Sequence, residues 1–319
     1  MIKAAIVKQA GIPPVLGQFP APVESADKVI VNVSTAALSK LSKFRSLGMH
    51  YSSETNFPIV AGADGVGTLA DGSRVYFALP AAPYGSLAEQ TIVEKNMIIH
   101  LPKEIDEVTA AAITNPAMSS WAALVYRAQF QSGQTVLING ATSESGSLAI
   151  QIAKYLGAKK IIATGRNHSK LQSLGADEFV AFDMNTDNGK QAFEKALEPA
   201  FADGVDVVLD YLWGDSAFAI LSAAAKAGGS RPTRFVSIGT AYGQEYINMP
   251  SSLLRASTIE LVGSGGRSVS QLNMLSSAQS VLDLASKGKI HIATTTFSLE
   301  DIEIAWNAPL TPRPVIMIK

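Results

Sequence analysis

The 319-residue chain contains no cysteine, which excludes disulfide bonds, thiolate nucleophiles and any zinc site built on cysteine ligands. Its four histidines, His50, His100, His168 and His291, lie far apart, and none has a second ligand at short spacing. Metal centres in proteins draw their ligands from closely spaced clusters. We therefore expect no metal site, and ordinary loop or strand positions for the histidines.

Blocks of one charge and long apolar runs are also missing. Lys and Arg number 26 against 27 Asp and Glu, so charge does not favour a nucleic-acid partner. The most apolar long segment, residues 110–125, is interrupted by Asn115 and Pro116 and cannot cross a bilayer. The chain starts with MIKAAIV, whose alternation is typical of a strand rather than of a secretory leader. We expect a soluble, cytoplasmic protein with no nucleic-acid or membrane partner.

The hydrophobic pattern divides the chain near Thr114. Before it, short apolar runs bounded by Gly, Pro and Asp-Gly predict a β-rich domain of barrel or partly open type. After it, strands alternate with segments of helical length, which predicts an α/β domain with a doubly wound parallel sheet of six strands. The six predicted strands are residues 135–139, 160–164, 178–182, 205–210, 234–239 and 259–263. Two strand-like runs near the end, 291–297 and 313–319, are assigned to neither half by periodicity alone.

The segment GATSESG, residues 140–146, connects the first two elements of the α/β half. The helix after it presents one apolar face, formed by Leu148, Ala149, Ile152, Ala153, Tyr155 and Leu156. With that face on the sheet, the helix N-terminus opens at the loop, where free N–H groups favour a pyrophosphate. Ser143 and Ser145 add hydroxyl donors, whereas Glu144 has to point to solvent because a desolvated carboxylate repels an anion. Taken alone, so glycine-poor a loop is equally typical of a purely structural turn.

The end of the second predicted strand carries the clearer signal. An acidic residue at this place binds the ribose 2′-hydroxyl of NAD, whereas a guanidinium accommodates the 2′-phosphate of NADP. Here the chain reads Gly165-Arg166-Asn167, with Lys170 nearby and no acid before Asp177. Arg166 offers a fork of donors suited to a phosphate. The sequence therefore predicts NADPH as the cofactor, against the alternative of a solvated surface arginine.

Spaced motifs along nearly the whole chain resemble the medium-chain dehydrogenase/reductase superfamily and, within it, the zinc-free quinone oxidoreductase-like group. The motifs are GADGVGTL (62–69), YGSLAEQTIV (84–93), AAAITNPAMSSWAAL (110–124), the segment 136–158 and SLGADEFVAFD (173–183). The resemblance implies a GroES-like domain over residues 1–114 and 264–319, closed by the strand at 313–319. It implies a Rossmann NADP-binding domain over 115–263, with substrate and nicotinamide meeting in the cleft between the domains.

Departures from the family pattern bear on metal and substrate. Zinc-dependent relatives carry a cysteine where this chain has Ala37-Leu38-Ser39, and Gly-His-Glu where it has Gly62-Ala63-Asp64. The resemblance thus implies chemistry without zinc and excludes alcohol dehydrogenase activity. The group's pattern LNPxDxYxRxG appears as LSKLSKFRSLG (38–48), so that Ser39, Ser42 and Phe44 replace polar groups of the cleft. The identity of the substrate stays open.

The predicted site combines the loop, the strand end and positions implied by the resemblance. The predicted cofactor-binding residues are Asn115, Ser119, Gly140, Ala141, Thr142, Ser143, Glu144, Ser145, Gly146, Gly165, Arg166, Asn167, Lys170, Tyr211, Leu212, Ile238, Gly239, Gly263 and Ser264. Hydride transfer is the cofactor's own chemistry, and the protein stabilises the oxyanion that forms. Tyr51 and Tyr84 are the candidate proton donors, although water serves equally well and tyrosines more often only pack.

These observations lead to one main functional hypothesis and two alternatives. The main hypothesis is an NADPH-dependent, zinc-independent reductase of quinones or of α,β-unsaturated carbonyl compounds. An enoyl-thioester reductase is the alternative enzyme, and a non-catalytic NADPH-binding redox sensor is the alternative without catalysis. The last predicted strand, TIELVG, leaves a sheet edge free to pair, and relatives dimerise there, so we expect a homodimer.

Overall fold

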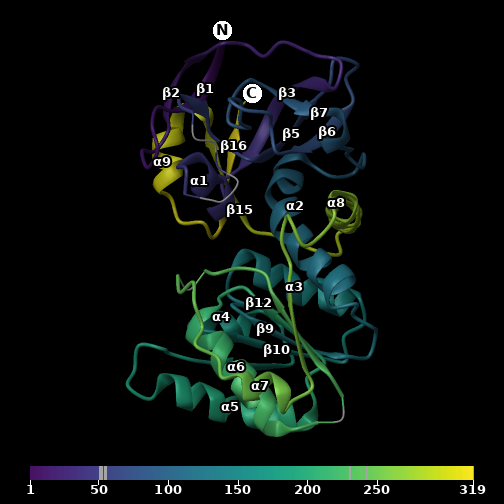
Figure 1. Ribbon diagram of the computed structural model, residues 1–319. Coiled ribbons are helices and arrows are strands. Elements are labelled where there is room, and N and C mark those ends of the chain that lie inside the picture. Colours follow the sequence, from purple (N-terminus) through teal and green to yellow (C-terminus); the bar gives the residue numbers. More distant parts are fainter. Residues whose placement is uncertain (50–52, 54–55, 230, 242, 319) are drawn as a thin grey trace. The chain divides into compact units, whose positions relative to one another are not determined.

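The computed structural model describes residues 1–49, 53, 56–229, 231–241 and 243–318 (Figure 1). The chain forms two compact units: Met1–Asn115 with Ala278–Lys319, and Pro116–Ser277. The domain bounds expected from the sequence differ from these units mainly in where residues 264–277 are counted. Two helices contribute residues to both units, α2 (Glu107–Ala122) and α8 (Gln271–Ser286).

The first unit is built on two sheets of mainly antiparallel pairing. One has the order β2-β1-β4, and the other the order β15-β16-β3-β5-β6-β8, with β7 paired to β3. The strands are β1 (Ile2–Val7), β2 (Val15–Phe19), β3 (Lys28–Ala37), β4 (Ile59–Val60), β5 (Asp64–Thr68), β6 (Arg74–Ala78), β7 (Gln90–Glu94), β8 (Ile98–His100), β15 (Thr294–Ser298) and β16 (Arg313–Met317). As the resemblance implies, the terminal strand β16 pairs with β3.

Short helices connect and cover these strands. They are α1 (Lys40–Ser46), η1 (Lys95–Met97), η3 (Leu299–Asp301) and α9 (Ile302–Asn307). Apolar side chains of β1, β3, α9 and β16 form one core cluster, which includes Leu38, Leu87 and Trp306. A second cluster lies between β3, β6 and β7, around Val31 and Phe77.

The second unit contains the predicted parallel sheet. Its six strands have the order β11-β10-β9-β12-β13-β14, and each adjacent pair is parallel. This is the order of a doubly wound dinucleotide-binding fold, so the predicted fold class is confirmed. The strands are β9 (Thr135–Asn139), β10 (Lys160–Gly165), β11 (Glu178–Ala181), β12 (Val207–Asp210), β13 (Thr233–Ser237) and β14 (Ile259–Gly263).

Helices cover both faces of this sheet. They are η2 (Ala123–Arg127), a π-helical turn, α3 (Glu144–Tyr155), α4 (His168–Ser173), α5 (Gly189–Asp203), α6 (Gly214–Ala227) and α7 (Ser251–Arg255). Figure 1 shows α3 on one side of β9, β10 and β12, and α5, α6 and α7 together on the other. On that second face Phe193, Leu197 and Ile220 join Leu137 and Val208 of the strands in a core cluster. The central strands β9, β10 and β12 are therefore buried on both faces, which explains their largely apolar sequences.

A buried carboxyl group lies within the first unit. Asp64 of β5 is 1% exposed, and its Oδ2 accepts a hydrogen bond of 3.0 Å from the hydroxyl of Tyr76 on β6. Burial raises the pKa of Asp64 to about 6, while the charge of Arg313 and the Tyr76 hydrogen bond oppose that rise. The folded chain therefore binds a proton at this carboxyl more tightly than the unfolded chain does.

This raised pKa predicts how the substitution Asp64→Asn changes with pH. Stability from the protonated carboxyl is present below about pH 4 and is lost as the pH rises through about 6. Asparagine does not ionise, so the unfolding free energy of the variant minus that of the parent should rise by up to about 3 kcal/mol between those values. Urea unfolding of both proteins across this range measures the difference, and a difference that stays flat contradicts the assignment.

Candidate functional site

The carboxyl ends of the parallel strands place most of the predicted cofactor residues along one edge of the second unit. Asn139 is aligned with Thr164 on one side and with Asp210 on the other, and Ser237 is aligned with Asp210 and Gly263. We call this row of strand ends the carboxyl edge. Ligands of doubly wound sheets bind beyond this edge, at the point where the strand order reverses. That point is the loop after β9, between β10 and β12.

The loop after β9 brings the start of α3 directly onto the strand end. Gly140 adopts a φ of +89°, and the N–H groups of Gly140 and Ala141 both donate to the carbonyl of Thr164 at 3.0 Å. A Cβ atom added at Gly146 would lie 2.4 Å from the Gly140 carbonyl oxygen. Only glycine at 146 therefore allows the helix to approach this closely, which fixes where its N-terminus opens.

Ser143 caps α3 and thereby uses its hydroxyl within the loop. Its Oγ accepts from the N–H of Gly146 at 3.1 Å and donates to the carbonyl of Gly140 at 2.8 Å. The sequence predicted a free hydroxyl donor here, and the structure instead assigns that proton to the turn. Within the described residues, the N–H groups of Thr142 and Ser145 donate to no acceptor. These unsatisfied donors at a helix start suit an anion.

Glu144 is the first residue of α3 and is half-buried. Its side chain makes no hydrogen bond or ion pair with any residue that the structure describes. A carboxylate in the first helical turn interacts favourably with the helix dipole. The same charge opposes an anion at the helix start, so the loop contributes less electrostatic attraction than an uncharged loop would.

The end of β10 presents the predicted arginine to solvent. Arg166 is exposed and, among the described residues, has no hydrogen-bond or ion-pair partner. Asn167 caps α4, its Oδ1 accepting from the N–H of Lys170 at 3.0 Å. The next acid in the sequence, Asp177, accepts a hydrogen bond of 2.7 Å from the N–H of Ile161, near the opposite end of β10. The first acid after Arg166 is therefore not at the carboxyl edge.

A row of buried polar side chains lies just beneath the carboxyl edge, and the sequence analysis missed it. Thr164 Oγ1 donates to Asn139 Oδ1 at 2.8 Å, and Asn139 Nδ2 donates to Asp210 Oδ1 at 2.8 Å. All three residues are 0% exposed. Burial raises the pKa of Asp210 to about 6, while hydrogen bonds from Leu212 N, Asn139 and Trp213 N oppose that rise. In the sequence, these residues could have been recognised as the polar residue at or near the end of each apolar strand.

Two further predicted residues lie against the loop, one of them buried and the other half-buried. The hydroxyl of Tyr211 lies 2.7 Å from Ser120 Oγ, and Ser120 donates to the carbonyl of Ser145 at 3.0 Å. Burial raises the pKa of Tyr211 above its usual value, so this phenol stays protonated. Leu212 is half-buried and would lie 3.0 Å from a Cβ at Gly140. Tyr211 and Leu212 thus support the loop from beneath.

The other predicted cofactor residues follow the remaining strands or lie on α2. The N–H groups of Ile238 and Gly239 donate to the carbonyl of Asp210 at 2.8 and 3.3 Å. Ser264 donates its N–H to Ser237 O at 2.8 Å, directly after Gly263 ends β14. Ser119 and Asn115 both lie on α2, with Asn115 as the last residue of the first unit's opening segment.

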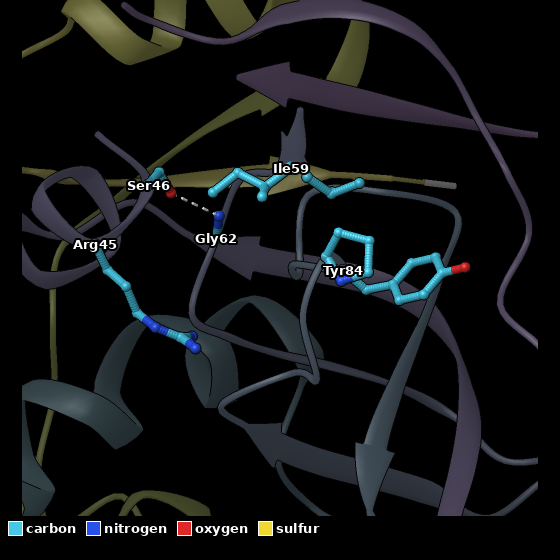
Figure 2. Close-up of a pocket in the computed structure, with 7 residues that line it drawn as sticks. Arg45, Ser46, Ile59, Gly62 and Tyr84 are labelled. Atoms are coloured by element: carbon cyan, nitrogen blue, oxygen red, sulfur yellow. Dashed lines mark hydrogen bonds between the residues drawn. The ribbon is translucent and has the colours of Figure 1, made fainter. Parts of the chain in front are cut away.

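Of the two candidate proton donors, Tyr51 lies outside the described residues. Tyr84 contributes to a small pocket of the first unit together with Arg45, Ser46 and Gly62 (Figure 2). Its ring packs edge-on against Phe19, with ring centroids 5.8 Å apart, and its hydroxyl donates weakly to Ala21 O at 3.4 Å. Figure 2 shows that this hydroxyl points away from Arg45. Packing therefore accounts for the position of the Tyr84 ring.

Two of the residues that differ from the family pattern, Ser39 and Ser42, stabilise the first turn of α1. Ser39 caps α1: its Oγ accepts from Ser42 N at 2.9 Å, and Ser42 Oγ accepts from Ser39 N at 2.7 Å. Both serines are buried, and this reciprocal pair forms a capping box. Phe44, on the same helix, is 44% exposed. The two serines thus stabilise the start of α1.

The described part of the chain offers neither a cluster of metal ligands nor a membrane-spanning helix. No group of three or more His, Cys, Asp or Glu side chains is arranged there to hold a metal ion. None of the helices traced in those residues is long and apolar enough to cross a membrane. Independence from zinc stays a prediction from the resemblance.

Known proteins with similar sequences are dehydrogenases and oxidoreductases by name. Residues 146–284 match a family model described as zinc-binding dehydrogenase. The chain is 25% identical to "Probable NADPH-dependent quinone reductase tdiC" of Emericella nidulans, over 95% of this chain and 96% of that protein. It is 32% identical to the chloroplastic NADPH-dependent alkenal/one oxidoreductase of Arabidopsis thaliana, over 51% of this chain. The matched part of this chain spans about half, 46%, of the length of the Arabidopsis protein.

Solved structures share the whole fold at low identity. A mycobacterial quinone oxidoreductase superposes with a TM-score of 0.83 at 18% identity, covering 100% of both chains. The quinone oxidoreductase of Thermus thermophilus, determined also in complex with NADPH, gives a TM-score of 0.77 at 22% identity, covering 99% of this chain and 100% of that one. The chain thus has the fold of these quinone oxidoreductases. In sequence it is similar to the quinone oxidoreductase-like group of the medium-chain dehydrogenase/reductase superfamily.

The contact between α3 and the end of β9 predicts a cost for Gly146→Ala. The added Cβ would lie 2.4 Å from Gly140 O and 2.7 Å from Ala141 Cα, both backbone atoms, so the helix has to move. We expect the unfolding free energy to fall by about 1–3 kcal/mol, as for other overpacked sites. Urea unfolding measures the change. Gly229→Ala is the control, because a Cβ there meets only ordinary contacts at 3.8 Å or more. Equal stability of Gly146→Ala and the parent protein contradicts the assignment.

Proposed function

We propose that the protein is an NADPH-dependent oxidoreductase that reduces quinones or α,β-unsaturated carbonyl compounds by hydride transfer, without zinc. The fold and the carboxyl edge support a dinucleotide cofactor. The names of the relatives, an NADPH-dependent quinone reductase and an NADPH-dependent alkenal/one oxidoreductase, support the cofactor and the substrate class.

The residues at the carboxyl edge fit the chemical groups of NADPH. The contact between Gly146 and Gly140 leaves the start of α3 open to a pyrophosphate, and the N–H groups of Thr142 and Ser145 are available to it. Arg166 supplies a guanidinium at the end of β10, where the 2′-phosphate of the adenosine ribose binds in this fold. When bound, NADPH supplies the hydride. The protein's share is to bind, to orient and to stabilise the developing negative charge.

The observation that carries the cofactor assignment is the charge at the end of β10. The guanidinium of Arg166 is exposed, and it makes no hydrogen bond or ion pair with a residue that the structure describes. Asp177, the first acid after it, is held near the other end of the strand. An exposed cation and no acid at this position favour a 2′-phosphate over a 2′-hydroxyl.

The proton that completes the reduction comes from a side chain or from water. Tyr51 and Tyr84 are the side-chain candidates in this proposal. Replacing each singly by Phe distinguishes them, because loss of a proton donor lowers kcat without raising the KM for NADPH. If both variants keep the parental kcat, water is the donor.

The proposal extends to assembly and location. β14 is an edge strand of the six-stranded sheet, and such an edge is free to pair with a second copy of the chain. We propose a cytoplasmic homodimer joined through β14. Sedimentation of the purified protein tests the dimer, and a Pro substitution at Leu261 in the middle of β14 should shift it to monomer.

Arg166→Ala tests the cofactor assignment. Loss of a charge-assisted contact to the 2′-phosphate should raise the dissociation constant for NADPH by about 10- to 100-fold and leave that for NADH unchanged. Lys159→Ala is a matched control, because Lys159 is an exposed cation just before β10, at its other end. Quenching of tryptophan fluorescence measures both constants. Equal affinity of the parent protein for NADPH and NADH overturns the assignment.

A spectrophotometric screen of NADPH oxidation tests the reaction. We expect turnover with quinones, alkenals or enones, and no loss of rate with a zinc chelator. Faster turnover of crotonyl thioester than of any quinone or enone would indicate an enoyl-thioester reductase instead. Tight NADPH binding with no acceptor reduced would indicate a non-catalytic sensor.

A further inference from the structure

The buried polar residues under the carboxyl edge form a directional chain across three neighbouring strands. Thr164 of β10, Asn139 of β9 and Asp210 of β12 occupy aligned positions, so their side chains share one face of the sheet. We call these three residues the polar row. The hydroxyl of Thr164 donates to the amide oxygen of Asn139, and the amide nitrogen donates to Asp210. The amide oxygen of Asn139 can only accept and its nitrogen can only donate, so the row runs from the Thr164 hydroxyl to the Asp210 carboxylate.

Each member of the polar row is coupled to a turn that carries a predicted cofactor residue. The carbonyl of Thr164 accepts the N–H groups of Gly140 and Ala141, which begin the loop at α3. Thr164 also lies two residues before Arg166. The loop after β9 and the turn after β10 are therefore held together at the strand ends.

Asp210 fixes the turn after β12. Its Oδ1 accepts the N–H of Leu212 at 3.1 Å, and its Oδ2 accepts the N–H of Trp213 at 3.1 Å. Trp213 has a φ of +61°, a conformation that costs free energy for a residue with a side chain. The carboxylate hydrogen bonds hold Trp213 in this conformation. Leu212, in the same turn, lies against Gly140 of the loop.

We propose that the polar row is a positioning device for the cofactor, setting the spacing of the three turns that follow β9, β10 and β12. This inference rests on the proposed function, since it concerns how the same site binds NADPH. None of the three side chains needs to touch the cofactor. The row acts through the backbone that it holds, so Asn139, Thr164 and Asp210 are positioning residues.

The substitution Asn139→Asp tests the proposal with almost no change in volume. It replaces the amide donor by a second carboxylate facing Asp210 at hydrogen-bond distance. Burial already raises the pKa of Asp210 to about 6, and a second carboxylate beside it raises the pKa of the pair further. Near pH 5.5 the pair therefore holds a shared proton that restores a hydrogen bond, and as the pH rises to about 8 and beyond a growing fraction of the pairs is doubly ionised and repels. The dissociation constant for NADP⁺ should therefore rise at least about tenfold at the higher pH, and most of this loss should be recovered at the lower pH.

The measurement is calorimetric titration with NADP⁺, expressed at each pH as the ratio of variant to parent, which cancels the titration of the cofactor's own phosphate. Asn139 of β9, which donates to Asp210, carries no charge, and neither does Ser216 of α6, which accepts from Asn139. Tyr211, the adjacent titratable group, stays protonated throughout because its pKa is raised. Asp210 of the parent also binds a proton near pH 6, so the pH dependence of the ratio combines that proton with the shared proton of the carboxylate pair.

Asp206→Asn is the matched control. Asp206 joins the same two strands at their opposite end, where its Oδ2 accepts the N–H of Thr135 at 2.8 Å. This variant changes a carboxylate between β9 and β12 without touching the carboxyl edge. Its NADP⁺ affinity should stay within about twofold of the parent at both pH values, whatever its stability. A loss as large as that of Asn139→Asp would mean that the polar row acts only through general stability and overturns the proposal.

Thr164→Val keeps the test decisive if Asn139→Asp does not fold. It removes only the hydroxyl donor of the row, and NADP⁺ binding should weaken about three- to tenfold with kcat preserved. Parent-like affinity in this variant, or in Asn139→Asp at about pH 8, overturns the inference while leaving the proposed function intact. Failure of the parent protein itself to bind NADP⁺ overturns the proposed function, and the inference with it.

Discussion

The close contact of α3 with the end of β9 is the constraint on which the nucleotide-binding geometry depends. Gly146 lies so near the carbonyl of Gly140 that any side chain at 146 would displace the helix. This contact places the helix N-terminus beside the strand end, where its N–H groups have no partner within the helix. The rest of the loop adapts to it: Ser143 caps the helix, and Thr164 accepts the N–H groups that open the loop. A loop with few glycines thus keeps the glycine that the geometry requires.

Buried polar groups specify register in a sheet whose other buried side chains are almost all apolar. A slip of one residue between β9 and β12 would turn the side chains of Asn139 and Asp210 to opposite faces and break their hydrogen bond. Leaving either buried group without a partner costs more free energy than a mismatched apolar contact. The same logic applies in the first unit, where Asp64 is buried against the hydroxyl of Tyr76. Burial raises the pKa of both aspartates, so each ionised carboxylate lowers the free energy of unfolding. In return, its hydrogen bonds form in only one arrangement of the strands.

The sequence predicted strands and fold class well because burial on both faces leaves a local signal. Residues 135–139 and 259–263 are strands with the predicted ends. The strand predicted at 205–210 begins only at Val207, since Asp206 bonds to Thr135 across the strand start. Tyr155 was expected on the apolar face of α3, but it is 53% exposed and contacts Trp121. Hydrophobic periodicity predicts the buried face of a helix to within about one residue. Contacts with other parts of the chain determine which residues at the edges of that face are buried.

The candidate site was predictable only where one segment carries the whole signal. GATSESG and Gly165-Arg166-Asn167 are local, and the structure places both at the carboxyl edge. The bond between Asn139 and Asp210 depends on β12 lying next to β9, although 71 residues separate the two positions. The hydroxyl contact of Tyr211 with Ser120 likewise joins the end of β12 to α2. No spacing rule connects such pairs, because sheet order, and not distance along the chain, brings them together.

Glu144 connects the form of the loop to the choice of cofactor. Its carboxylate stands at the start of α3 and opposes the pyrophosphate, a group that NADH and NADPH share. In the proposed complex this repulsion weakens both cofactors alike, so it cannot discriminate between them. In the same proposed complex, Arg166 interacts with the 2′-phosphate, which only NADPH carries. In that complex the loop binds the pyrophosphate of either cofactor weakly, whereas the end of β10 binds only the 2′-phosphate of NADPH. The affinity for the cofactor therefore depends strongly on the 2′-phosphate. Because Glu144 weakens the contact that both cofactors share, Arg166 would contribute a larger fraction of the binding free energy of NADPH.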